Sequence, residues 1–116
     1  MIKFQNLDGK PVEFGYWHPE IIKAQNLIAV WSARNGIDVR ISSGNDRTHS
    51  TKSLHYEDLA FDFLAVGDDR ESLSILATNS LVLFLQKNLG LGYDIVWQSY
   101  QHYNHAHLEW DVRQRT

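Results

Sequence analysis

The chain of 116 residues contains no cysteine. Disulfide bonds and thiolate metal sites are therefore excluded, and any metal ion must be held by histidine and carboxylate side chains. Long apolar runs are also missing, since the longest fully apolar runs, such as residues 81–85, are far too short to cross a bilayer. We therefore expect no membrane partner.

Positive charge is scarce as well. The chain has 11 Lys and Arg against 14 Asp and Glu, a net charge of -3, and its basic residues are scattered. Phosphate groups are bound by basic faces, so this balance argues against nucleic acid as the main partner and against a metal-dependent nuclease. The N-terminal end shows no basic segment followed by an apolar stretch, so we expect no signal peptide and synthesis in the cytoplasm.

The length and a hydrophobic fraction of 43% suit one domain over residues 1–116 with a packed core. Pro19 and Gly36 predict the ends of a helix over about residues 18–35. Upstream, residues 1–17 are predicted to be irregular or a short strand. The remaining predicted elements are a strand over 37–42, a loop over 43–53, a strand over 58–66, a helix over 68–87, and strands over 92–98 and 105–112. This order predicts an α+β fold, a small antiparallel sheet with helices packed on one face.

Asp62 stands in the middle of the apolar run 59–66. Burying an ionised carboxylate there costs several kcal/mol unless the group has a strong partner. One candidate partner is a divalent metal ion bound between two strands. The structural alternative is an ion pair in the core, with Arg40 or Arg47.

The last predicted strand alternates, so that His105, His107, Glu109 and Asp111 fall on one face and the apolar residues between them on the other. Two histidines at this spacing can place one on a metal ion and the other beside the water that the metal activates. The alternative is the polar, solvent-facing side of an edge strand.

His55, seven residues before Asp62, adds a third candidate ligand. Taken together with the histidines of the last strand, these side chains favour a metal site. A set of His, carboxylate and His with an open fourth position is typical of catalytic zinc, which lowers the pKa of water to about 7.

Residues 53–62, Ser-Leu-His-Tyr-Glu-Asp-Leu-Ala-Phe-Asp, resemble the S-x-H-x-x-G-x-A-x-D signature of the D-alanyl-D-alanine metallopeptidase group. That group includes phage L-alanyl-D-glutamate endolysins and shares its site with lysostaphin-type peptidases and hedgehog domains. Residues 105–110 resemble the H-x-H-[hydrophobic]-E-[WF] strand of many phage members, and residues 42–47 resemble the S-G-x-R segment with one extra residue before the arginine. The resemblance covers about residues 37–112, with Asp58 where the signature has glycine.

The resemblance implies a hedgehog/D-Ala-D-Ala-peptidase-like fold and a zinc ion held by His55, Asp62 and His107. It also implies that Arg47 faces a substrate carboxylate or oxyanion, with Ser53 as part of the signature at the cleft. The implied substrate is a peptide bond of bacterial peptidoglycan, in the stem peptide or the cross-link.

The position three residues before the last ligand commonly carries an acidic general base in this group, and here it is Asn104. The spacing of His102, His105 and His107 also resembles that of penicillin-insensitive murein endopeptidases, in which the two earlier histidines serve the proton transfers. This similarity implies His105 as base or transition-state stabiliser, with His102 in support. Glu109 could accept the free N–H of a ligand histidine, or could be a surface charge at the strand end.

We therefore expect a zinc peptidase of phage or prophage origin, made in the bacterial cytoplasm and acting on the wall after release or from the virion. The alternative is a zinc-binding structural or recognition module of a virion that has lost hydrolysis, which Asn104 favours.

Overall fold

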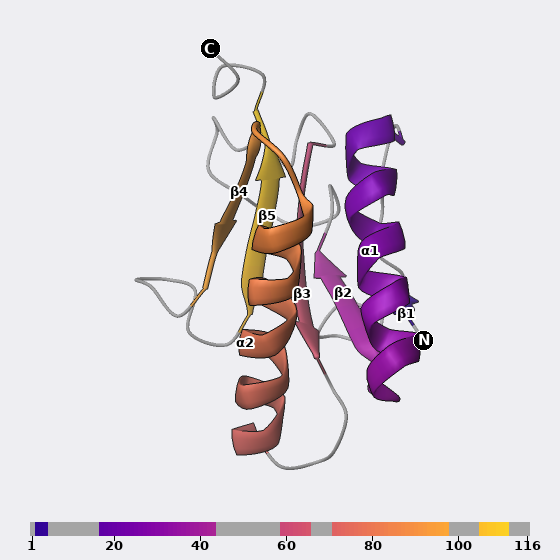
Figure 1. Cartoon of the computed structure of the whole chain (residues 1–116), viewed down its shortest axis with the longest axis vertical. Coiled ribbons are helices and arrows are strands. Elements are labelled where there is room, and N and C mark those ends of the chain that lie inside the picture. Colours follow the sequence, from indigo (N-terminus) through magenta and orange to yellow (C-terminus); the bar gives the residue numbers. More distant parts are fainter. Residues whose placement is uncertain (1, 5–16, 44–58, 66–70, 98–104, 112–116) are drawn as a thin grey trace.

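The computed structural model describes residues 2–4, 17–43, 59–65, 71–97 and 105–111 (Figure 1). Along these residues the elements follow in the order β1 (Ile2–Phe4), α1 (Pro19–Asn35), β2 (Val39–Ser43), β3 (Ala60–Ala65), α2 (Glu71–Asn88), β4 (Tyr93–Val96) and β5 (Ala106–Trp110). The helices and strands predicted from the sequence are confirmed within a few residues at their ends. The predicted loop over 43–53 lies outside the described residues, apart from Ser43, which ends β2.

The described strands form one sheet in the order β1-β2-β3-β5-β4. Neighbouring strands are antiparallel except at one edge, where β1 runs parallel to β2 with Ile2 opposite Val39. The sheet is therefore mixed, and the expectation of a purely antiparallel sheet was wrong. The α+β class itself is confirmed. Local alternation over three residues gives no sign of strand direction, which depends on how the chain returns to the sheet through α1.

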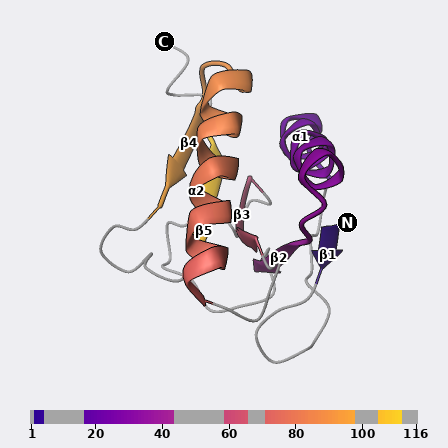
Figure 2. The same cartoon turned by 60° about the horizontal axis from the view of Figure 1, so that its bottom comes forward.

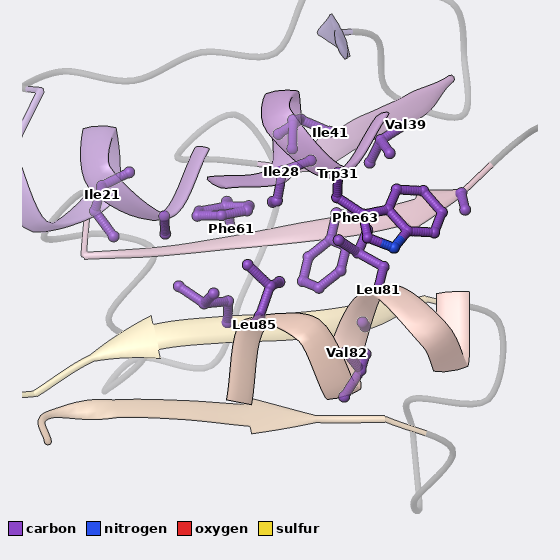
Figure 3. Packing of buried hydrophobic residues seen from close by; sticks show 14 residues of the cluster. Ile21, Ile28, Trp31, Val39, Ile41, Phe61, Phe63, Leu81, Val82 and Leu85 are labelled. Atoms are coloured by element: carbon purple, nitrogen blue, oxygen red, sulfur yellow. The ribbon is translucent and has the colours of Figure 1, made fainter. Parts of the chain in front are cut away.

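Both helices cover the same face of the sheet, α1 over β1 and β2 and α2 over β3 and β5 (Figures 1 and 2). The hydrophobic core lies between these two layers (Figure 3). Its fully buried side chains include Ile21 and Ile28 of α1, Phe61 and Phe63 of β3, and Leu85 of α2. The core therefore takes alternate residues of each strand and leaves the others on the face opposite the helices.

Backbone chemistry sets the ends of α1. Pro19 occupies the first turn, where its missing N–H costs no hydrogen bond. Gly36 ends the helix in the left-handed region with φ 64°, and its N–H donates to the carbonyl of Ser32. The hydroxyl of Tyr93 donates to the carbonyl of Glu20 at 2.8 Å, which joins β4 to the start of α1.

Helix α2 is joined to the sheet by a buried polar contact. The N–H of Ala65, at the end of β3, donates to Oγ1 of Thr78 at 2.9 Å, and Thr78 is fully buried. Among the described residues, no helix has the length and apolar character that crossing a membrane requires.

Candidate functional site

The candidate site lies on the sheet face opposite the helices, where β3 and β5 pair in antiparallel fashion. Their register sets Asp62 directly opposite His107 and Phe61 opposite Leu108. Because Phe61 and Leu108 are fully buried in the core, the alternating positions Asp62 and His107 point away from it. Packing of the apolar residues on one face therefore places the carboxylate and the imidazole side by side on the other.

His107 contacts two carboxylates at once. Its Nδ1 lies 3.0 Å from Oδ1 of Asp62, and its Nε2 lies 3.0 Å from Oε1 of Glu109. His105 lies next to this pair, with its Nε2 3.9 Å from Oδ2 of Asp62. The side chains of Asp62 and His107 are only 13% and 12% exposed, whereas His105 at 28% is more open to solvent.

The two carboxylates control the charge of His107. Burial lowers the pKa of this imidazole, but the hydrogen bonds to Asp62 and Glu109 outweigh burial and raise the pKa to about 9. At neutral pH the ring is therefore an imidazolium, with both nitrogens donating to carboxylate oxygens. One positive charge held between two negative ones is a stable arrangement without a metal.

The same side chains suit a zinc ion by donor type, since imidazole nitrogen and carboxylate oxygen are both zinc ligands. A divalent cation would take the place of a proton of His107, because a ligating nitrogen needs its lone pair. Nδ1 is the nitrogen on the Asp62 side, so Nδ1 would be the ligating atom. Nε2–H would stay with Glu109, which fixes the ring orientation as carboxylates commonly do beside metal-bound histidines.

The structure brings together four of the residues singled out in the sequence: Asp62, His105, His107 and Glu109. The other candidates lie outside the described residues: Arg47, Ser53, His55, His102 and Asn104. Within the described part of the chain, no three His, Asp or Glu side chains form a group that could hold a metal ion. The expected third ligand, His55, belongs to the part that is not described.

Two structural alternatives can be compared with the geometry. Strand β5 lies between β3 and β4, so the histidines do not stand on an edge strand. The printed ion pairs of Asp62 with described residues come from His107 and His105 and not from Arg40. A core ion pair of Asp62 is thus present, and its described partners are the candidate metal-site histidines themselves.

Two charged residues on this face escaped the sequence reasoning. Arg40 lies opposite Leu64 of β3, and Asp94 of β4 lies directly opposite Glu109. The alternation of residues 37–42 predicts that Arg40 lies on the polar face of its strand. The strand order and register, which no local pattern carries, place it beside the site.

With this geometry described, comparison with known proteins adds no relative: no family model matches the chain, and no curated protein matches it.

Proposed function

We propose that the protein is a zinc-dependent peptidase that hydrolyses peptide bonds of bacterial peptidoglycan, with His55, Asp62 and His107 as zinc ligands. The observation that carries this proposal is the cross-strand contact of Asp62 with His107 at 3.0 Å, with His105 next to it. Two stretches 45 residues apart meet at the residues that a His, Asp, His zinc site requires. The finer fold assignment, a hedgehog/D-Ala-D-Ala-peptidase-like sheet, belongs to the same proposal.

The residues divide the chemistry among them. Zinc bound by this set would polarise the carbonyl of the scissile bond and lower the pKa of the attacking water. Asp62 and Glu109 hold the ring of His107 from its two sides and keep Nδ1 directed at Asp62. His105 is partly exposed and lies beside Asp62, so its Nε2 can accept a proton during attack and return it to the leaving amine.

Metal content is the first test. Protein purified without chelator should carry stoichiometric zinc, and both His107→Ala and His55→Ala should lose it. His18→Ala is the matched control, because His18 lies at the start of α1, in the helix layer away from the site. Asp62→Ala should lose zinc and also melt at a lower temperature, because metal binding contributes to folding free energy. A folded His107→Ala variant that keeps its zinc would remove His107 from the site.

Turnover is the second test. Purified bacterial walls are digested with and without chelator, and the released fragments are identified by mass spectrometry. We expect chelator-sensitive release of peptide fragments that persists in Asn104→Ala and is lost in His105→Ala. Loss in Asn104→Ala with full activity in His105→Ala would contradict the assignment of the base.

A second candidate function rests on Asn104. An amide cannot take a proton from water at neutral pH, so a chain with Asn104 at the base position suits a zinc-binding recognition module of a virion. Zinc-loaded protein that binds walls but releases no fragment from any wall type would favour this module over the peptidase.

A further inference from the structure

Arg40 carries an unmatched guanidinium on the same sheet face as the Asp62–His107 pair. It lies in β2 between Val39 and Ile41, which are both fully buried in the core, so its side chain points to the face opposite the helices. Its Nε is buried and meets no hydrogen-bond acceptor among the described residues. Arginine keeps its charge at any physiological pH, so an unmet donor here is costly.

The neighbouring charges of the described residues are already engaged. Lys3 lies opposite Arg40 on β1, and its Nζ lies 3.2 Å from Oδ2 of Asp38. Asp62, the nearest carboxylate on β3, faces the two histidines. Arg40 is thus a cation at the edge of the candidate site whose Nε has no acceptor within the described part of the chain.

The register places Arg40 close to the reacting groups. Arg40 is opposite Leu64, and Asp62 lies two residues along the same strand, which makes Arg40 and Asp62 diagonal neighbours about 7–8 Å apart at the backbone. One step beyond the pair of Phe63 and Ala106, His105 lies beside Leu64 from the other side. Arg40 and His105 therefore flank Leu64 on one row of the face.

We propose that Arg40 binds a carboxylate of the substrate, and so selects peptides that carry a carboxylate near the scissile bond. The fixed fork of guanidinium donors matches the two oxygens of a carboxylate. The separation of about 7–8 Å corresponds to about two residues of extended peptide, so the selected carboxylate belongs to a residue next to the cleaved bond. This inference rests on the proposed function for the identity of the ligand as a wall peptide.

The test compares a wall stem peptide with the same peptide in which the carboxylates are converted to amides. Wild-type protein should prefer the carboxylate form, and Arg40→Gln should raise KM for that form by roughly tenfold or more, as expected for the loss of a charged hydrogen bond. KM for the amide, kcat and zinc content should change little. Lys3→Gln is the matched control, because Lys3 is a cation on the same row that already has a partner, and it should leave the preference intact.

A folded Arg40→Gln variant that keeps the full preference for the carboxylate would overturn the proposal. If Arg40→Gln does not fold, Arg40→Lys replaces it, since lysine keeps the charge but lacks the fork of donors. We expect Arg40→Lys to lose most of the preference, and an unchanged preference would equally overturn the assignment.

A binding measurement separates this inference from the proposed function. Calorimetry of zinc-loaded protein with a short glutamate-containing peptide and its glutamine counterpart needs no turnover. Tighter binding of the glutamate peptide to wild type, but not to Arg40→Gln, supports Arg40 even when no wall is cleaved. Equal binding of the two peptides to wild type, or no binding of either, refutes it.

Discussion

Raising the pH should destabilise the metal-free protein through His107. The folded-state pKa of about 9 lies above the ordinary value of 6.5, so the charged ring stabilises the fold. This contribution is fully present below pH 6.5 and is lost as the pH rises through 9. Because each pKa unit corresponds to about 1.4 kcal/mol, the contribution is about 3 kcal/mol. The side chain of His107 is only 12% exposed, so solvent screens this interaction weakly.

The assay is urea unfolding in the presence of chelator at pH 6, 7.5 and 9.5. His107→Gln is measured in parallel, because glutamine keeps a polar side chain at this position but does not titrate. The free energy of unfolding of wild type minus that of the variant should fall by about 3 kcal/mol between the lowest and highest pH. A difference that stays constant over this range would refute the arrangement of one imidazolium between Asp62 and Glu109.

Zinc should reverse part of this dependence. Binding replaces a proton of His107, so the apparent affinity for zinc should rise by up to about tenfold per pH unit between pH 6.5 and 8. Competition with a chromogenic chelator in buffered zinc measures this slope. An affinity independent of pH would show that His107 gives up no proton on binding, and therefore that it is not a ligand.

Three further changes test single contacts. Glu109→Gln weakens the acceptor of His107 Nε2–H and should lower zinc affinity about 10–100-fold in the same chelator competition, with no effect refuting the orienting role. Thr78→Val removes the acceptor of the buried Ala65 N–H and should lower the free energy of unfolding by about 1–3 kcal/mol, while zinc content stays unchanged. Gly36→Ala forces a side chain into the left-handed region and should cost about 1 kcal/mol by urea unfolding, although no atom crowds the position. An unaltered unfolding midpoint in either variant would contradict the contact assigned to it.

The candidate site was open to sequence reasoning in one respect and closed in another. Alternation along residues 105–110 places His105, His107 and Glu109 on one face whatever the partner strand is, and the structure has them there. The contact of His107 with Asp62 depends on register, and a shift of one residue would turn either side chain into the core. The separate resemblance of residues 53–62 and 105–110 to one family's motifs is what suggested the meeting.

Local chemistry along the chain determined the class of elements and their faces: Pro19 and Gly36 bound α1, and the alternation of apolar residues decides which side chains of β2 and β5 enter the core. The tertiary structure alone decided the parallel pairing of β1, the interior place of β5, and the position of Arg40 beside the Asp62–His107 pair. The physical reason is that periodicity is a property of neighbouring residues, whereas strand order and register follow from how Phe61, Phe63, Ala106 and Leu108 pack together beneath the two helices.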